Sequence, residues 1–235
     1  MTIRTLGLAA AAVVATAATA TARCVSILHT GDVHGYVDAQ NERANATLDA
    51  TLADYAALLE RHATFAAARK CAPLAFDSGD WADGTGLSDA TRVKGQLIYD
   101  FVTQLPRGAP FVTTAGNHDL GRDATVTYMA AHFAPRMRNR FVTTNTFYYN
   151  ESAPPAPPQA CPSAAERPLR RLGAPYAVVD ASGVRVFVIG LMYVFTNGAA
   201  NACQVPPVDA VRDAALQNAL RNARPDLIAV VAHID

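Results

Sequence analysis

The sequence has no excess of charge of either sign, because 20 Lys and Arg residues balance 20 Asp and Glu residues. This balance gives no support for binding to nucleic acid or to an anionic membrane, both of which recruit basic surfaces. A charged substrate would therefore have to be met by local groups or by metal. The chain also lacks a CxxC pair or a Cys/His cluster, which excludes zinc-finger chemistry. No internal repeat is evident.

Long apolar runs are scarce, and the one that matters for targeting is N-terminal. Arg4 precedes an apolar run over residues 6–15, and small residues then lead to Ala22. This order of charged, apolar and small residues predicts a signal peptide over residues 1–22, cleaved after Ala22. The alternative is a transmembrane anchor, but the apolar core is short for one and passes into Thr-containing sequence. We therefore expect a secreted protein, or one in the lumen of the secretory pathway, with no stable membrane anchor.

The four cysteines of an exported chain point to disulfide bonds. Cys24 and Cys71 each precede an apolar run. If these runs are neighbouring parallel strands, the two cysteines lie at the same end of the sheet. We expect the pairs Cys24–Cys71 and Cys161–Cys203, the second across a loop-rich excursion. Free buried thiols are the alternative.

Apolar runs rich in β-branched residues alternate with helical patterns along the chain. The expected strands are 25–30, 73–76, 110–114, 141–144, 176–179, 184–191 and 227–232, and the expected helices are about 48–70, 93–105 and 208–222. A hairpin is expected to turn at residues 181–183. The alternation predicts an α/β fold with parallel strands and outer helices. Residues 150–168 are rich in Pro and Ala, and we interpret them as a loop excursion within one domain rather than a linker.

Polar side chains follow four of the expected strands at their carboxyl ends, where ligands of parallel α/β sheets gather. They are Asp32 and His34 after the first strand, Asp80 after the second, Asn117, His118 and Asp119 after the third, and His233 after the last. Carboxylate, imidazole and amide donors together suit Mn²⁺, Fe, Zn²⁺ or Mg²⁺ rather than thiophilic metals. One carboxylate between two clusters can bridge a metal pair, which neutralises phosphate charge and lowers the pKa of a bridging water.

A structural interpretation of the same residues is also available. Asp after a strand is commonly a helix N-cap or a turn residue, so Asp32 or Asp80 alone would indicate little. Together with His34 and Asn117 they favour a metal site.

These stretches resemble the calcineurin-like metallophosphoesterases, and in particular their secreted 5′-nucleotidase branch. The resemblance is carried by ILHTGDVHG, DSGDWADGTGLSD, KGQLIYDFV, VTTAGNHDLG, FVTTNTF and IAVVAHID, in this order from about Val25 to the end of the chain. It implies a layered α/β/β/α sandwich over residues 23–235. It also implies hydrolysis of phosphoric esters, foremost nucleotides, by hydroxide activated at a dinuclear metal centre. The implied cofactors are two divalent metal ions among Mn, Zn, Fe, Mg and Ca, and the implied partner is a small-molecule phosphate ester.

The resemblance also implies a role for each site residue. Asp32 and His34 would bind the first metal, Asn117 and His233 the second, and Asp80 would bridge the two. His118 would assist the leaving oxygen as a general acid or stabilise the transition state, with Asp119 orienting its ring. General acid catalysis of this kind contributes roughly 10²–10⁴ in rate.

The sequence departs from the family pattern at its end. The family closes its site with a Gly-His-x-His motif after the lone histidine, whereas this sequence has no such motif and stops two residues after His233. We therefore interpret the chain as the N-terminal part of a longer enzyme, truncated at its C-terminus. Two alternatives stay open: a phosphodiesterase or general phosphomonoesterase using the same site, and a truncated, non-catalytic exported protein that retains the fold.

Overall fold

The computed structural model describes residues 24–36, 40–41, 46–47, 50–105, 108–149, 161 and 169–234. The signal peptide expected at residues 1–22 lies outside this part of the chain, as does the Pro- and Ala-rich stretch 150–168 apart from Cys161.

Three parallel strands form the first sheet in the order β1-β4-β5. They are β1 Val25–Thr30, β4 Ala72–Asp77 and β5 Phe111–Thr113. Val25 is in register with Ala72, so the cysteines that precede them are neighbours. Cys24 and Cys71 form a disulfide with their Cα atoms 4.5 Å apart, which confirms the predicted pair. At the other end of these strands, the polar loops leave the sheet side by side.

The second sheet has the order β11-β9-β8 and combines parallel and antiparallel pairing. Its strands are β8 Ala177–Ala181, β9 Val184–Met192 and β11 Leu227–His233. The β8–β9 hairpin turns at Ser182 and Gly183, whose φ angles of 51° and 83° fit a two-residue type I′ turn. The predicted hairpin is therefore confirmed.

Two smaller sheets complete the strands. One has the order β10-β6-β7, with β6 Thr146–Tyr148, β7 Arg170–Arg171 and β10 Ala202–Gln204. The other pairs β2 Gln40–Asn41 with β3 Ala46–Thr47. Cys203 of β10 forms the predicted disulfide with Cys161. The strand expected at 141–144 is reduced to single bridges from Phe141 to Thr113 and from Val142 to Ala174.

The helices are shorter and more divided than the sequence predicts. They are α1 Leu52–Ala68, α2 Gly86–Asp89, α3 Gln96–Val102, α4 Asp123–Tyr128, a π-helical turn Met129–Phe133, α5 Ala134–Met137, a 3₁₀ turn Arg138–Arg140, α6 Pro207–Arg212 and α7 Ala214–Ala223. The helix expected at 208–222 is interrupted at Asp213, where the backbone is extended with ψ 128°. The Asp213 side chain caps α7 by accepting from the Leu216 N–H, a typical use of Asp at a helix start.

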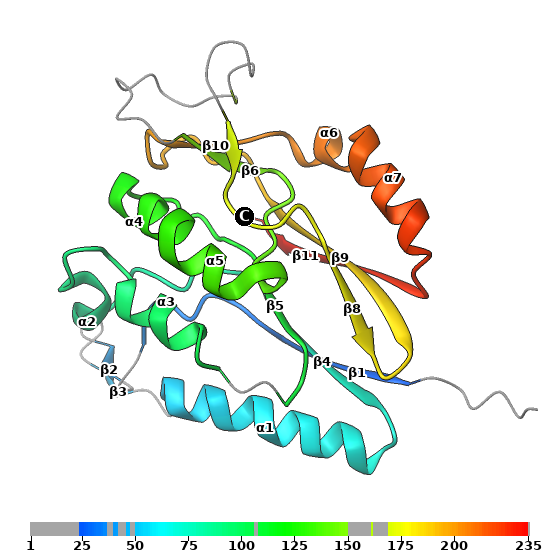
Figure 1. Ribbon diagram of the computed structural model, residues 1–235. Coiled ribbons are helices and arrows are strands. Elements are labelled where there is room, and N and C mark those ends of the chain that lie inside the picture. Colours follow the sequence, from blue (N-terminus) through cyan, green and yellow to red (C-terminus); the bar gives the residue numbers. More distant parts are fainter. Residues whose placement is uncertain are drawn as a thin grey trace, which may run out of the picture.

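Three apolar clusters hold these elements together in four layers. Between the two sheets lie side chains such as Leu74, Val112 and Val186, all at most 1% exposed. One cluster fills the space between the first sheet and helices α1, α3, α4 and α5, and the third packs α6 and α7 against the second sheet. Figure 1 shows the helices on the outer faces of the two sheets. The layered α/β/β/α sandwich predicted from the sequence is therefore confirmed.

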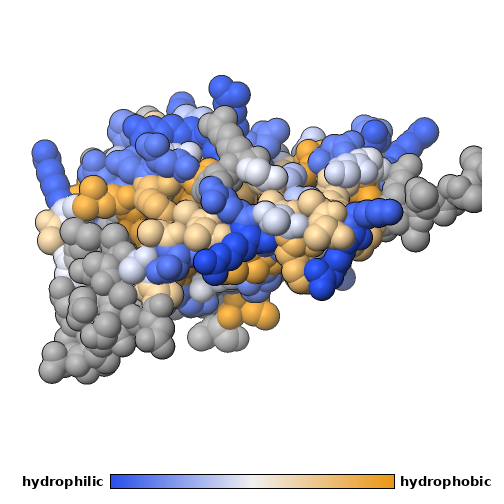
Figure 2. All heavy atoms as spheres, turned by 90° about the horizontal axis from the view of Figure 1, so that it is seen from below, coloured by the Kyte–Doolittle hydropathy of each residue, from blue (hydrophilic) through white to orange (hydrophobic). Residues whose placement is uncertain are grey.

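Helix α1 lies at the lower edge of the molecule in Figure 1. The face seen from below carries a band of apolar residues bordered by hydrophilic side chains (Figure 2). Two large apolar side chains of α1 are exposed, Leu58 at 42% and Phe65 at 49%. The Arg69 guanidinium lies 3.6 Å from the centroid of the Phe65 ring and partly covers it. Within the described part of the chain, none of the helices has the length and apolarity that crossing a membrane requires.

Candidate metal centre

The loops that follow β1 and β4 are joined by backbone hydrogen bonds at the carboxyl edge of the first sheet. The Asp32 N–H donates to the carbonyl of Gly79, and the His34 N–H donates to the carbonyl of Asp80, both at 2.9 Å. Asp32, His34 and Asp80 have φ angles of 56°, 49° and 59°, a left-handed region that non-glycine residues rarely adopt. Backbone strain of this kind is concentrated at functional sites, because it persists only where the surroundings enforce it.

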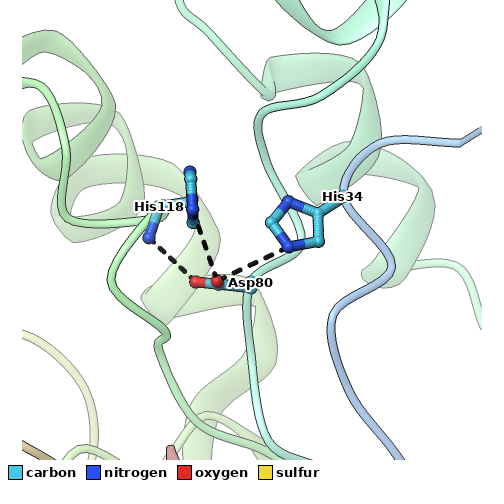
Figure 3. A group of neighbouring side chains, drawn as sticks. All are labelled: His34, Asp80 and His118. Atoms are coloured by element: carbon cyan, nitrogen blue, oxygen red, sulfur yellow. Dashed lines mark hydrogen bonds and ion pairs between the residues drawn. The ribbon is translucent and has the colours of Figure 1, made fainter. Parts of the chain in front are cut away.

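Asp80 lies at the centre of the site, and its side chain is 2% exposed. Its Oδ1 accepts a hydrogen bond of 2.8 Å from the backbone N–H of His118. Its Oδ2 faces three imidazole nitrogens, the Nε2 atoms of His233 at 3.4 Å, His34 at 3.8 Å and His118 at 4.0 Å. Figure 3 shows His34 and His118 on either side of the Asp80 carboxylate. One oxygen of Asp80 is thus anchored, and the other points into a ring of potential ligands.

Backbone carbonyl groups set the orientation of two of these rings. His34 Nδ1 donates to the Asp83 carbonyl at 2.9 Å, and His233 Nδ1 donates to the Ser78 carbonyl at 3.0 Å. A neutral imidazole that carries its proton on Nδ1 has its lone pair on Nε2. Both lone pairs then point toward Asp80, the arrangement by which a second hydrogen bond prepares a histidine for metal binding.

Asn117 adds a further oxygen to this ring. Its Oδ1 lies 2.9 Å from His233 Nε2. Both atoms are acceptors when the imidazole is neutral, and a cation beside them satisfies the two together, as would a proton on Nε2 or a rotation of the amide that presents its NH₂ group. Oxygen and nitrogen atoms whose lone pairs converge on one point are the ligands that Mn²⁺, Fe and Zn²⁺ take. The residues therefore fit a divalent metal.

The potential ligand atoms form two groups that share Asp80. One contains His34, Asp80 and His118, the other Asp32, Asp80 and His233, with the ligand atoms of each group within 4.8 Å of one another. The structure thus brings the predicted ligands to one place, with Asp80 common to both groups. His34 Nε2 lies 3.6 Å from Asp32 Oδ1, so the two residues expected to share the first metal are neighbours. Asp32 is the most accessible of them, with its side chain 61% exposed.

Asp119 takes a different position from the expected one. Its Oδ2 accepts from the backbone N–H groups of Asp80 and Gly116, both at 2.9 Å. Its Oδ1 accepts from the N–H groups of Trp81 and Ala82 at 3.1 Å and from the Tyr99 hydroxyl at 2.7 Å. The carboxylate is 1% exposed and ties the loop after β4 to the loop after β5. In this structure Asp119 organises the backbone of the site, and the His118 ring is oriented by another residue.

That residue is Asp83, for which the sequence pattern predicts no role. Asp83 Oδ2 lies 2.8 Å from His118 Nδ1, and Asp83 Oδ1 lies 2.6 Å from Lys94 Nζ. Burial alone would raise the pKa of Asp83, but the hydrogen bonds and positive charges of Lys94 and His118 outweigh it and hold the pKa at about 2. The sequence signal was a carboxylate three residues after Asp80 in a glycine-containing turn, which is also an ordinary turn composition.

The surroundings of Asp80 disfavour the negative charge on its carboxylate. Burial, followed by the nearby charge of Asp119, raises the pKa of Asp80 to about 6, while the charges of His233 and His118 act in the opposite direction. A buried carboxylate with a raised pKa, in a cluster of histidines, is typical of functional sites.

The α/β/β/α sandwich thus presents a cluster of potential metal ligands at the carboxyl ends of its strands, where ligands of α/β sheets bind. The family model of the calcineurin-like phosphoesterases matches residues 25–233. The chain therefore belongs to the calcineurin-like phosphoesterase family. The match covers every residue of the candidate site.

Individual relatives are distant. An uncharacterised protein of Schizosaccharomyces pombe is 25% identical over 211 residues, which cover 89% of this chain and 32% of the relative. A protein of Arthroderma benhamiae named as a secreted protein is 23% identical over 89% of this chain and 29% of its own length. The solved structure of a 5′-nucleotidase from Candida albicans has a TM-score of 0.72 at 23% identity, covering 92% of this chain and 37% of that one. The chain spans about a third of the length of the curated relatives it matches.

Proposed function

We propose that this chain hydrolyses phosphoric esters with the help of two divalent cations, and that nucleotides are its substrates. The observation that carries the proposal is the position of Asp80 Oδ2, which faces the Nε2 atoms of three histidines while Oδ1 is held by a backbone N–H. Family membership supports phosphoester chemistry. The fold is similar to that of a 5′-nucleotidase structure, and this analogy supports the choice of nucleotides as substrates.

The ligands proposed for the cations are Asp32 and His34 on one side and Asn117 and His233 on the other, with Asp80 shared. Bound there, the cations would neutralise phosphate charge and lower the pKa of a bound water. The chain's contribution is to hold the ligand atoms in advance, since Nδ1 of His34 and of His233 is already bonded to a backbone carbonyl. Preorganised ligands of this kind need little rearrangement to bind metal.

His118 is proposed to act on the leaving oxygen. Its side chain is 37% exposed and therefore within reach of a substrate, whereas Asp80 beside it is buried. When both ring nitrogens are protonated, Nδ1 donates to Asp83 and Nε2 is free to donate a proton to an alkoxide as the ester bond breaks. The neighbouring ring of His34 meets His118 edge-on at a centroid distance of 4.8 Å and limits its rotation.

The proposal includes export. The N-terminal pattern of Arg4, an apolar run and small residues supports a signal peptide, and the A. benhamiae relative is named as a secreted protein. Two disulfides within the chain are consistent with an oxidising compartment. Mass spectrometry of the mature protein from the culture medium tests this, and cleavage directly after Ala22 would give a new N-terminus at Arg23. A secreted form that retains residues 1–22 would contradict the predicted cleavage.

The activity is tested with three substrates on the purified chain. We expect AMP hydrolysis in the presence of Mn²⁺ or Zn²⁺, its loss with EDTA, and its loss in Asp80→Asn with the circular dichroism spectrum retained. Comparison with p-nitrophenyl phosphate and bis(p-nitrophenyl) phosphate separates a nucleotidase from a general phosphomonoesterase or a phosphodiesterase. Unchanged hydrolysis in Asp80→Asn would contradict the mechanism, and a folded, metal-binding but inactive chain would support the non-catalytic alternative.

A further inference from the structure

A cavity of about 430 Å³ lies outside the candidate metal centre, lined by residues of helices α6 and α7 and of strands β6 and β7. Figure 1 shows these two helices on the outer face of the second sheet. Small-molecule sites commonly occupy cavities of roughly 300–1,000 Å³. None of the residues that line this cavity is a proposed metal ligand, so binding of a ligand in it does not depend on the proposed function.

Most of the wall of this cavity is apolar. Leu216 and Ala219 line it from α7, and Phe147 lines it from β6. Tyr176 also lines it, and its ring is stacked on the Phe187 ring of β9 at a centroid distance of 4.8 Å. Stacking of this kind holds the Tyr176 ring in place before any ligand binds. The wall therefore suits an apolar or aromatic group.

Arg171 of β7 brings a positive charge to the same cavity, and its side chain is half-buried. Its guanidinium lies 4.5 Å from the centroid of the Phe147 ring, and Nη1 donates to the Thr144 carbonyl. Within the part of the chain that the structure describes, no carboxylate forms an ion pair with Arg171. A guanidinium has several N–H donors, so most of the donors of Arg171 are left over. They suit the carboxylate of a ligand.

Two carboxylates line the cavity as well. Asp209 belongs to the first turn of α6, and Asp213 lies at the break between α6 and α7. One oxygen of Asp213 accepts from the Leu216 N–H, and the charge of Asp213 opposes the lowering of the Arg171 pKa that burial causes. The Asp209 side chain forms no hydrogen bond or ion pair with another described residue. These carboxylates suit an ammonium group.

We propose that this cavity binds a free α-amino acid with an apolar side chain. The carboxylate of the ligand would accept from Arg171, and its ammonium group would lie beside Asp209 and Asp213. Its side chain would pack against Phe147 and Tyr176. A simple anion would be repelled by the two carboxylates, and a simple amine would be repelled by the guanidinium. A zwitterion avoids both conflicts.

Matched ligands test the two charges separately. Isothermal titration calorimetry is carried out on the purified chain with EDTA, so that no probe binds by chelating a metal. We expect saturable binding of L-phenylalanine or L-leucine. The analogues without the ammonium group are 3-phenylpropanoate and 4-methylpentanoate, and those without the carboxylate are phenethylamine and 3-methylbutylamine. Each should bind about ten- to a hundredfold more weakly than its parent, the range that a hydrogen bond between charged groups contributes.

Glycine lacks the apolar side chain and should also bind at least about tenfold more weakly. Absence of binding by both apolar amino acids would overturn the proposal. An analogue or glycine that binds as tightly as the better amino acid would overturn it too, because one charge or the backbone alone would then account for the affinity.

Two variants locate the binding in this cavity. Arg171→Met should raise the Kd of the amino acid by about ten- to a hundredfold, but it also removes the contacts with Phe147 and Thr144. The double variant Asp209→Asn, Asp213→Asn keeps the cap of α7, because Asn caps helices as well as Asp does. It should bind the amino acid at least about tenfold more weakly and bind the analogue without the ammonium group no less tightly than the original chain.

Arg170→Met is the matched control, because Arg170 is the exposed neighbour of Arg171 in β7 and does not line the cavity. Its affinity for the amino acid should equal that of the original chain. If the double variant retains the full affinity, or if Arg170→Met loses as much as Arg171→Met, the amino acid does not bind in this cavity and the proposal fails.

Discussion

Nε2 of His233 lies 2.9 Å from Oδ1 of Asn117, and both atoms accept hydrogen bonds while the imidazole is neutral. The contact brings the end of β11 against the loop after β5, so strands from both sheets meet there. With the amide oriented in this way the acceptor pair is unfavourable, and it is relieved by a positive group beside it or by rotation of the amide. A cation that binds only the folded chain would remove this conflict and stabilise the fold.

We therefore expect Mn²⁺ at about 100 times its Kd to raise the melting temperature by roughly 5–10 °C, since such saturation adds about 2.7 kcal/mol. In Asn117→Leu one of the two facing acceptors is gone. The metal-free variant should then melt at or above the temperature of the original chain at pH 8, and its response to Mn²⁺ should be smaller. Scanning calorimetry with EDTA and with Mn²⁺ measures both, and an equal response in the two proteins would count against Asn117 as a ligand.

The grouping of the site residues could be predicted because strand ends carry positional information. In a parallel sheet the carboxyl ends of β1, β4 and β5 share one edge, so Asp32, Asp80 and Asn117 had to come together once the strands were identified. The pairing of Cys24 with Cys71 followed from the same reasoning applied to the opposite edge.

Side-chain direction in the loops could not be predicted in this way. Asp119 is next to His118 in sequence, yet its carboxylate turns inward to accept hydrogen bonds from four backbone N–H groups. Asp83 is far from His118 in sequence and reaches it because the loop after β4 curls through left-handed residues. Such turns depend on tertiary contacts, which periodicity and composition do not encode.

The buried position of Asp119 leads to a prediction about stability. Asn in its place would put an NH₂ group opposite at least two backbone N–H donors, so we expect Asp119→Asn to lower the free energy of unfolding by about 3–5 kcal/mol. Tyr99→Phe removes one hydrogen bond from the same carboxylate and should cost about 1.5 kcal/mol. Urea unfolding measures both. An Asp119→Asn protein of unchanged stability but lowered activity would favour the ring-orienting role expected from the sequence.

Asp77, fully buried beneath the site, gives a prediction about pH. Burial raises its pKa to about 7, although hydrogen bonds from Thr30 Oγ1 and the Gly79 N–H oppose the shift. Between the usual carboxyl pKa of about 4 and pH 7, the folded state keeps a proton that the unfolded state has released. This group therefore makes stability fall as the pH rises through that window, by up to about 1.4 kcal/mol per pH unit.

Asp77→Asn does not titrate and isolates this contribution. The stability of the variant relative to the original chain should increase from pH 4 to pH 7 and then stay constant, whatever constant offset the lost hydrogen bonds produce. Urea midpoints at four pH values give the difference. Parallel stability curves for the two proteins would mean that Asp77 keeps an ordinary pKa in the folded state.

Gly116 tests how closely the loops around Asp80 are packed. A Cβ atom at this position would lie 2.0 Å from Asp80 Oδ1 and 2.5 Å from the Asp80 nitrogen, and a backbone atom held by Asp119 cannot move aside cheaply. We expect Gly116→Ala to displace the Asp80 carboxylate, to cost roughly 1–3 kcal/mol as overpacking usually does, and to abolish the Mn²⁺-induced rise in melting temperature. Gly108→Ala is the matched control, because a Cβ there would meet nothing within 4 Å. If Gly116→Ala responds to Mn²⁺ as fully as Gly108→Ala does, Asp80 cannot be the carboxylate on which cation binding depends.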